Sequence, residues 1–518
     1  MKFLQKILAT LEKNELYFVV FVTGACVLII EIAAVRILSP YFGNTIYTFS
    51  SIITTILLAL SLGYFLGGRL ADKSPSKLLF YQLIFASSIG VFLLLILSYL
   101  VLPSVAYYFS IISGPLITAV LLFLFPSFIL GMLSPFVIKL EKDNYKKEGV
   151  GKISGNVFFA STLGSIAGSL LAGFVLIPRF GVDQIILGVG IALLFIGILG
   201  TVSSGAQKHK LKILIIAAIF ASVAAGLFIK QQKIISENSV FVKDGVYEKI
   251  IIYDANLGGK PIRVMLLDRS YSGAMYLDSD DLVQTQSKYY ELYKIFKPKI
   301  SEALVIGGAT YSIPKALISE SPDIKVDVVE IEPEGYEIAK KYFRVPENPR
   351  LTNYTADGRR FLHDTDKKYD LIFGDAYYSY YNIPAHLTTK EFFELARGRL
   401  TSEGVFIGNF IGVLDRNPPT LLFSQIKTFR QVFPNSYFFA VENPKSSEVQ
   451  NFIFVGVAGE GKIDFESDEV KLSNNDLFQK LESKLIDVSS INLEKYQILT
   501  DNFSPVEYLT AEVYQSIN

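Results

Sequence analysis

The sequence is poor in the residues that build disulfides, metal sites and catalytic triads. It has one cysteine, Cys26, and three histidines, His209, His363 and His386, in 518 residues. A single cysteine excludes an intrachain disulfide and a zinc site made of cysteines. The histidines are too scattered along the chain to indicate a histidine-rich metal site or a Ser-His-Asp triad. No metal site is therefore predicted.

Net charge is also lacking, because 49 basic and 49 acidic residues cancel. A chain without a basic excess gives no support for nucleic-acid binding. Hydrophobic residues make up 51% of the chain and the mean hydropathy is +0.38, but this excess lies almost wholly before Lys230. The change in composition, in a chain too long for one compact core, predicts an apolar first domain and a polar second part.

Long apolar stretches recur through residues 1–230, which are predicted to form a multi-pass α-helical membrane domain. Each stretch has roughly the 17 to 25 residues that cross the hydrocarbon core of a bilayer as a helix. The chain is therefore expected in the cell membrane, with the lipid bilayer as its partner. About seven spans are predicted, at 17–37, 46–67, 79–102, 116–138, 154–177, 184–202 and 213–229.

Basic residues gather in alternate connections between these spans, and the opposite connections hold almost none. The positive-inside rule then predicts a cytoplasmic amino terminus. An odd number of spans places the polar second part outside the cytoplasm. The basic residues used for this prediction are Lys2, Lys6, Lys13, Arg69, Lys73, Lys77, Lys139, Lys142, Lys146, Lys147, Lys152, Lys208, Lys210 and Lys212.

Two features inside the spans have both a packing and a functional interpretation. The pairs Gly63 with Gly67 and Gly164 with Gly168 have GxxxG spacing, which predicts close helix packing. Glu31 lies within the first span, where a carboxylate is costly and indicates function by default. The structural alternatives are a pair between Glu31 and another helix, and an Arg36 side chain that extends toward the membrane surface.

The polar second part begins with strand-like alternation and then changes to alternating strands and helices. Residues 249–253 and 263–267, with turn residues between them, predict a small β-hairpin subdomain over 231–286. The later alternation predicts an α/β Rossmann-like, methyltransferase-type domain over 287–518, with a parallel sheet covered on both faces. Its predicted strands are 303–306, 325–330, 370–373, 404–410, 437–441 and 452–457.

Polar side chains at the predicted strand ends indicate a nucleoside site. Gly307 and Gly308 follow the first strand, and Glu330 closes the second, where a carboxylate can accept ribose hydroxyl hydrogens. Asp357 and Asp375 follow later strands at the same sheet edge. Taken singly, Asp357 could be a helix N-cap, Asp375 a turn former and Glu330 a solvated strand end.

These residues resemble the spermidine synthase family of aminopropyltransferases over most of residues 235–460. The similar segments are LVIGG at 304–308, VVEIEPE at 328–334, DGRRF at 357–361, YDLIFGDA at 369–376 and LTTKEFF at 387–393. The first half also resembles a membrane domain found fused to such domains. The segments are EIAAVRILSPYFG at 31–43 and GYFLGGRLAD at 63–72. The chain as a whole thus resembles a membrane-fused spermidine synthase-like protein.

The resemblance implies roles for the strand-end carboxylates. Glu330 would bind the ribose of decarboxylated S-adenosylmethionine, beside Gly307 and Gly308, and Asp357 would contact its adenine. Asp375 would help to remove a proton from the attacking amine. The co-substrate is expected to be S-adenosylmethionine or its decarboxylated form, with an amine as acceptor and no permanently bound cofactor. Assembly is left open, a homodimer included.

Four substrate positions depart from the family pattern. Thr310 stands where the family has the aspartate that grips the aminopropyl ammonium, Ser272 stands for a glutamine, and Tyr378 for a second acid. The segment 284–286 replaces a Tyr-His-Glu stretch. Each lost charge-assisted hydrogen bond is worth about 1.5 to 3 kcal/mol. Divergence from ordinary spermidine synthesis is therefore expected.

Two functions from different classes follow. The first is a transferase that moves an aminopropyl or methyl group from an S-adenosyl-type donor to an amine or a membrane-associated acceptor. The alternative is a non-catalytic nucleoside- or polyamine-binding or sensing domain, coupled to a membrane anchor or transporter. The predicted extracytoplasmic position conflicts with the first, because adenosyl donors are cytoplasmic metabolites.

Overall fold

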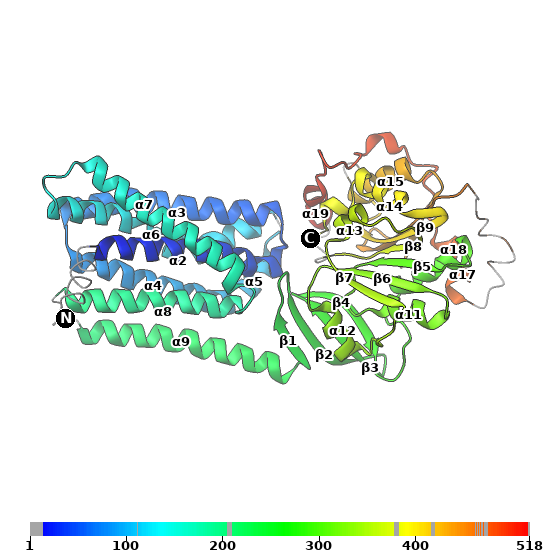
Figure 1. Cartoon of the computed structure of the whole chain (residues 1–518), viewed down its shortest axis with the longest axis horizontal. Coiled ribbons are helices and arrows are strands. Elements are labelled where there is room, and N and C mark those ends of the chain that lie inside the picture. Colours follow the sequence, from blue (N-terminus) through cyan, green and yellow to red (C-terminus); the bar gives the residue numbers. More distant parts are fainter. Residues whose placement is uncertain are drawn as a thin grey trace. The chain divides into compact units, whose positions relative to one another are not determined.

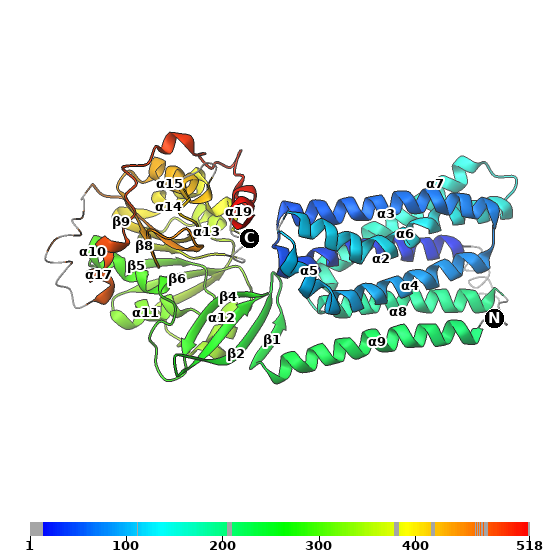
Figure 2. The same cartoon turned by 180° about the vertical axis from the view of Figure 1, so that it is seen from behind.

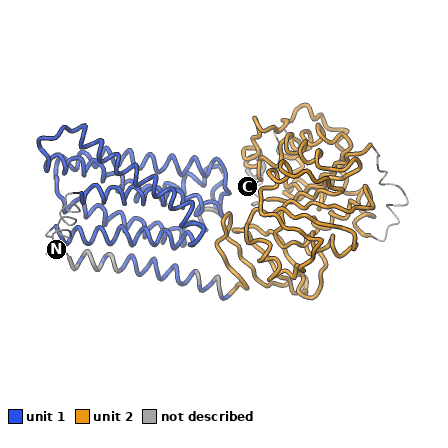
Figure 3. The backbone as a smooth tube through the Cα atoms, in the orientation of Figure 1, with its two compact units in different colours: residues 1–237 blue, residues 238–518 orange. Residues whose placement is uncertain are grey.

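The computed structural model describes residues 14–110, 112–204, 210–377, 383–415, 420–460 and 475–515, with 463, 465, 467 and 470. The chain divides into two compact units, residues 1–237 and 238–518, coloured separately in Figure 3. Each unit has its own hydrophobic cores.

The first unit is a bundle of helices (Figure 1). Six helices are long and apolar enough to cross a bilayer, and one of them, α7, continues into a short π-helix, η1. The six helices coincide with the first six predicted spans. The helices of this unit are α2 (Glu15–Phe42), α3 (Ile46–Lys73), α4 (Lys77–Leu100), α5 (Leu102–Tyr108), α6 (Ser113–Asn144), α7 (Val150–Leu171), η1 (Ala172–Leu176), α8 (Val182–Ser203) and α9 (Lys210–Glu237).

The seventh predicted span, 213–229, falls in α9, which is not among the six. Within the residues that the structure describes, the apolar helical part of α9 is only Ile219–Gln231. This is shorter than the roughly 17 residues needed to cross the hydrocarbon core. Figure 2 shows α9 alongside α8. The two helices contact each other, and each of them also contacts α4. A seventh crossing stays a prediction.

Glycines allow the helix backbones of the first unit to approach closely, which confirms the packing role predicted for both GxxxG pairs. A Cβ on Gly164 would lie 1.9 Å from the carbonyl oxygen of Phe21, and one on Gly168 would lie 2.4 Å from that of Ala25. α7 therefore lies directly against α2. Gly63 and Gly67 hold α3 against α6 in the same way.

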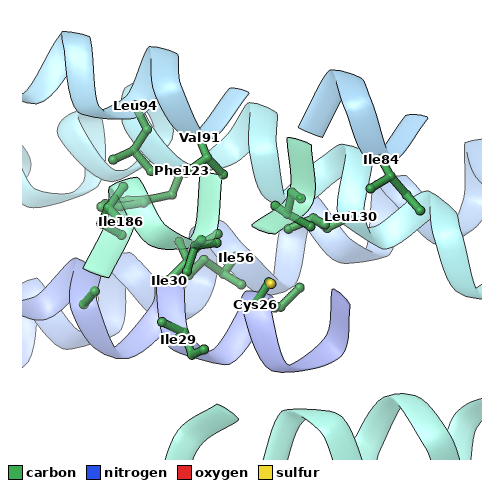
Figure 4. Packing of buried hydrophobic residues seen from close by; sticks show 14 of the residues in the cluster. Cys26, Ile29, Ile30, Ile56, Ile84, Val91, Leu94, Phe123, Leu130 and Ile186 are labelled. Atoms are coloured by element: carbon green, nitrogen blue, oxygen red, sulfur yellow. The ribbon is translucent and has the colours of Figure 1, made fainter. Parts of the chain in front are cut away.

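The core of the bundle is filled by apolar side chains from helices along the whole first unit, and Figure 4 shows part of it. Ile30 of α2 is fully buried and lies beside Cys26, which is a free, buried thiol. Phe123 of α6 and Ile186 of α8 close the same core from other sides. The single cysteine is thus a packing residue, as its apolar surroundings favour.

The second unit begins with a four-stranded antiparallel sheet, β1 (Phe241–Asp244), β2 (Lys249–Leu257), β3 (Lys260–Leu267) and β4 (Ser270–Tyr276). The predicted hairpin is its central pair, β2 with β3, and the flanking strands extend it. Ile250, Ile252 and Met265 of this small sheet pack on Phe343 of helix α12 (Gly335–Phe343). The small sheet is therefore fixed to the larger part of the unit through α12.

The larger part is a seven-stranded sheet in the order β10-β11-β9-β8-β5-β6-β7. Five neighbouring strands, from β9 to β7, are parallel, and β11 pairs antiparallel with both β9 and β10. The sheet is Rossmann-like, as predicted, but mixed. Its strands are β5 (Glu302–Ile306), β6 (Lys325–Glu330), β7 (Leu351–Thr355), β8 (Tyr369–Gly374), β9 (Leu400–Gly412), β10 (Ser436–Ala440) and β11 (Gln450–Val457).

Helices cover both faces of this sheet, because side chains of each strand alternate between two cores. In β5, Ala303 and Val305 join the core under α11 (Ser312–Glu320), whereas Leu304 and Ile306 join the opposite one. That opposite core is covered by α13 (Gly358–Asp364), α14 (Lys390–Gly398) and α15 (Leu421–Val432). Parallel strands with both faces covered leave their carboxyl ends as the edge where polar groups collect.

Gly164→Ala should destabilise the helical unit, because its methyl group would overlap the Phe21 carbonyl in the contact between α7 and α2. Such overpacking typically costs about 1–3 kcal/mol. We expect a lower thermal midpoint for the detergent-solubilised full chain. Gly155→Ala is the control, because nothing lies within 4 Å of a Cβ at that position of the same helix. Equal midpoints for the two variants would contradict the close packing.

Candidate functional site

The loop after β5 has an unusual backbone that Gly307 makes accessible. Gly307 has φ +95°, and a Cβ there would lie 2.3 Å from the carbonyl oxygen of Asp375. Ala309 and Tyr311 also have positive φ, at 44° and 56°. Such values are uncommon for residues with side chains. The loop is therefore held against the end of β8 in a conformation that its surroundings must stabilise.

Tyr311 supplies part of that stabilisation. Its side chain is fully buried at the start of α11, and its hydroxyl donates to Oδ1 of Asn353 in β7 at 2.5 Å. Its ring lies 5.4 Å from that of Tyr336, and burial raises the pKa of its hydroxyl. A Cβ on Gly308 would overlap the Tyr311 ring at 2.4 Å. Both glycines of the predicted diglycine turn are thus needed sterically.

Glu330 closes β6 and binds the loop through its carboxylate. Oε2 accepts hydrogen bonds from the N–H groups of Gly308 at 2.8 Å and Ala309 at 3.1 Å. Oε1 accepts from the N–H of Glu332 at 2.9 Å. The interpretation of Glu330 as a solvated strand end is wrong, because this carboxylate orders the loops that follow two neighbouring strands.

Asp357 is the N-cap of α13 and also lies in the pocket. Its Oδ1 accepts from the N–H of Arg360 at 2.9 Å, and its Oδ2 lies 2.9 Å from Nε2 of His386. The hydrogen bond with His386 is the main cause that holds the pKa of Asp357 below its ordinary value. The interpretation of Asp357 as a helix N-cap is therefore confirmed. Its Oδ2 atom is nevertheless directed to His386, a residue of the pocket.

Asp375 follows β8 and is the most strongly desolvated carboxylate of the site. Burial raises its pKa to about 6, although a hydrogen bond from Nδ2 of Asn409 at 2.9 Å opposes this rise. Asn409 belongs to β9, is 6% exposed, and its Oδ1 has no hydrogen-bond partner among the described residues. The hydroxyl of Tyr377 donates to the Asn409 carbonyl. A carboxylate with a pKa near 6 can accept a proton at neutral pH.

One pocket collects nearly all predicted site residues. Gly307, Gly308, Glu330, Asp357 and Asp375 line it, and so do Thr310 and Ser272, the two described positions of the predicted substrate group. Thr310 is 4% exposed, and its hydroxyl lies 2.8 Å from that of Ser312. A Cβ on Gly273 of β4 would lie 2.6 Å from the Thr310 side chain. The Ser272 hydroxyl donates to the Ser270 carbonyl at 3.2 Å. Tyr378 lies outside the described residues.

The charge of the pocket is one-sided. Four carboxylates line it, from Glu248, Glu330, Asp357 and Asp375, and the described lining includes no lysine or arginine. His386 is the one titratable base in that lining. Among the described residues, no cluster of three or more His, Cys, Asp or Glu side chains could hold a metal ion. The arrangement therefore suits an organic cation.

Three lining residues, His386, Asn409 and Glu248, were not predicted from the sequence. They lie on the 3-10 helix η4 (Ala385–Leu387), on β9, and in the connection before β2, outside the segments that carried the resemblance. No local pattern marks any of them. The signal available was indirect, since His386 directly precedes the LTTKEFF segment that carried the resemblance.

Residues 286–467 match the family model described as the spermine/spermidine synthase domain. The second unit carries a spermine/spermidine synthase domain. The chain is 27% identical over 220 residues to a polyamine aminopropyltransferase of Vibrio vulnificus, covering 42% of this chain and 72% of the relative. It is 24% identical over 412 residues to polyamine aminopropyltransferase 2 of Aquifex aeolicus, covering 75% of this chain and 77% of the relative. Since 75% exceeds the share held by residues 238–518, that similarity also includes part of the helical unit.

Solved structures similar to the synthase domain have TM-scores below 0.5. A probable spermidine synthase from Corynebacterium glutamicum has a TM-score of 0.43 at 19% identity, covering 51% of this chain and 97% of that one. Spermidine synthase from Thermotoga maritima has a TM-score of 0.34 at 20% identity, covering 46% and 80%.

Gly307→Ala should disrupt the site, because alanine at φ +95° is strained and its methyl group would overlap the Asp375 carbonyl. Backbone strain of this kind costs about 1–3 kcal/mol. We expect a lower thermal midpoint and weaker binding of ligands in this pocket by calorimetry. Gly398→Ala, with nothing within 4 Å of its Cβ, is the matched control in the same unit. Unchanged affinity in Gly307→Ala would show that the loop does not shape the ligand site.

Proposed function

We propose that the second unit transfers an aminopropyl group from a sulfonium donor, decarboxylated S-adenosylmethionine, to an amine. The observation that carries this proposal is the pocket lined by four carboxylates and, within the described residues, by no lysine or arginine. Both reactants are cations, so the pocket would attract each of them. The loss of acids at Thr310 and Tyr378, which favoured divergence from spermidine synthesis, is offset by these remaining carboxylates.

The proposed chemistry uses Asp375 as the proton acceptor. The amine nitrogen attacks the carbon attached to the sulfonium sulfur, and the carbon–sulfur bond breaks with its electron pair going to sulfur. The products are a neutral thioether nucleoside and an extended amine, whose excess proton passes to the Asp375 carboxylate. A pKa of about 6 keeps this carboxylate ionised at neutral pH while retaining basicity. Asn409 would fix its orientation through the 2.9 Å hydrogen bond.

Glu330 and Asp357 would bind the nucleoside part of the donor. An ionised carboxylate has about four lone-pair sites, and Glu330 uses three for backbone N–H groups. One site then remains for a ribose hydroxyl, rather than the two that the sequence suggested. Asp357 has free acceptor capacity beside its bonds to Arg360 and His386, and could accept from the adenine amino group.

Asp375→Asn should lower kcat roughly 10²- to 10⁴-fold, the usual contribution of a general base. The assay follows the thioether nucleoside formed by the full chain from decarboxylated S-adenosylmethionine and putrescine or spermidine. In the unsubstituted chain kcat/KM should fall as the pH drops through about 6, because Asp375 becomes protonated there. The variant should lack this dependence, and an active, pH-independent variant would exclude Asp375 as the base.

Folding of this variant can be checked separately. Because burial raises the pKa of Asp375 in the folded chain, its charge destabilises the fold at pH values above about 6, and stability is higher where the group is protonated. Asparagine removes that charge, so the thermal midpoint at pH 7.5 should be unchanged or higher.

Calorimetry with S-adenosylmethionine, its decarboxylated form and methylthioadenosine then separates two functions. Binding without turnover of any amine would favour the non-catalytic alternative, and methylated product from S-adenosylmethionine would assign methyl transfer instead.

We further propose that the first unit lies in the membrane and that α9 is a seventh crossing. Support comes from six helices of sufficient length and hydropathy, and from the contacts of the 28-residue α9 with α4 and α8. With a cytoplasmic amino terminus, the synthase domain would then lie outside the cytoplasm. The donor would have to reach that side.

A single-cysteine labelling experiment tests this orientation. Cys26 is buried in the helical core, so it provides an unlabelled background for Asp366→Cys, at a fully exposed position of the synthase domain. In sealed vesicles of known orientation, an impermeant maleimide should label Asp366→Cys from the face opposite the amino terminus. Labelling only from the cytoplasmic face would exclude the seventh crossing and remove the conflict with donor supply. Release of the chain by alkaline carbonate would exclude membrane insertion altogether.

A further inference from the structure

Glu31 takes no part in the proposed transfer, yet it lies in the middle of the helical unit. It is the only Asp, Glu, Lys or Arg between Glu15 and Arg36 in the 28-residue helix α2. Its neighbours in α2, Ile30 and Ala33, are buried in the apolar core. An unpaired carboxylate at this depth of a bilayer is costly, so its presence needs a compensating partner or a function.

Protein partners for Glu31 are absent from the part of the chain that the structure describes: it has no hydrogen bond and no ion pair there. Arg36 is five residues away, outside the i+3 and i+4 positions that meet on a helix face. The other charged or titratable side chains described on α2 and on the helices packed against it do not bond to Glu31. They are Glu15, Tyr17, Cys26 and Tyr41 of α2, Tyr47, Tyr64, Arg69, Asp72 and Lys73 of α3, Tyr108 of α5, Lys139, Glu141, Lys142 and Asp143 of α6, Lys152 of α7, and Asp183 of α8.

The neighbouring helix has an irregular turn at the same level. Gly164 lies against Phe21 and Gly168 against Ala25, so the register of α7 on α2 brings Glu31 level with the π-helical turn η1. In this turn the N–H of Ile177 donates to the carbonyl of Ala172 at 3.0 Å. Single π-turns inside α-helices occur frequently at functional sites. η1 contacts α2 directly.

The level of Glu31 is also open at the side of the bundle. Phe174 within η1 is 77% exposed, and Glu31 itself is only partly buried. In a bilayer these side chains would meet lipid. A carboxylate without a cationic partner is far less costly there in its protonated, uncharged form than as an anion.

We propose that Glu31 is a proton-binding site in the middle of the membrane unit. It holds a proton while it faces the apolar surroundings and loses it only when water or a cation reaches the level of η1. The helical unit is then a proton-responsive element and more than an anchor. The inference depends on the proposed membrane insertion but not on the proposed transfer reaction.

Carbodiimide labelling of the full chain in membrane vesicles tests this site. A hydrophobic carbodiimide adds to a protonated carboxyl group, and the adduct rearranges to a stable N-acylurea that peptide mass spectrometry detects. Dicyclohexylcarbodiimide should modify Glu31, and the modified fraction should fall as the pH is raised. A water-soluble carbodiimide should leave Glu31 unmodified. Glu31→Gln should remove the adduct.

Glu141 is the matched control, because it is a carboxylate of the same unit that is only 3% exposed and is therefore closed to both reagents. It should remain unmodified by either reagent. Absence of the Glu31 adduct in membrane-retained protein, or equal modification by the water-soluble reagent, would overturn the proposal. Protection of Glu31 by spermidine at constant pH would assign the site to an organic cation in place of a proton. Carbonate extraction of the chain would instead overturn the membrane insertion on which the inference depends.

Discussion

The carboxylate of Glu330 is the interaction on which the geometry of the pocket depends. It accepts hydrogen bonds from Gly308, Ala309 and Glu332, and thereby joins the loops that follow β5 and β6. The loop after β5 has positive φ at three positions, so it would relax without these bonds. Charge-assisted hydrogen bonds of this kind are about twice as strong as neutral ones, so they favour this strained conformation of the loop. The same group that can bind a ligand therefore also shapes the site that receives it.

The pocket combines an anionic lining with unequal solvation of its acids. Asp357 has a lowered pKa because His386 and a backbone N–H stabilise its charge, whereas Asp375 has a raised pKa because it is desolvated. Two carboxylates of the same edge are thus suited to different tasks, one for binding as a permanent anion and one for proton exchange. Their difference arises from local surroundings and not from residue type.

Most of the second unit could be predicted because its central strands are short apolar runs that end at glycines or acids. The strand β7 was missed, since Leu351–Thr355 is half polar and forms a sheet edge with one buried residue. The carboxylates at strand ends could be predicted because parallel strands end at one edge, and six spans could be counted from length and hydropathy alone. Asn409 and His386 could not, because they meet Asp375 and Asp357 only through pairings between distant segments. The three hydrogen bonds of Glu330 likewise depend on a loop conformation that no local pattern specifies.

The packing of α12 between the two sheets limits how a ligand can enter. Phe343 joins the core of the small sheet while Ala339 joins the core of the large one, and Gly273 of β4 lies against Thr310. Movement of the small sheet away from the large one would expose both hydrophobic interfaces at once. The small sheet is therefore a fixed side of the pocket. Exchange of reactants for products then depends on other parts of the lining, in which the His386 side chain is 43% exposed. Ligand exchange therefore depends on the part of the domain whose movement breaks the fewest buried apolar contacts.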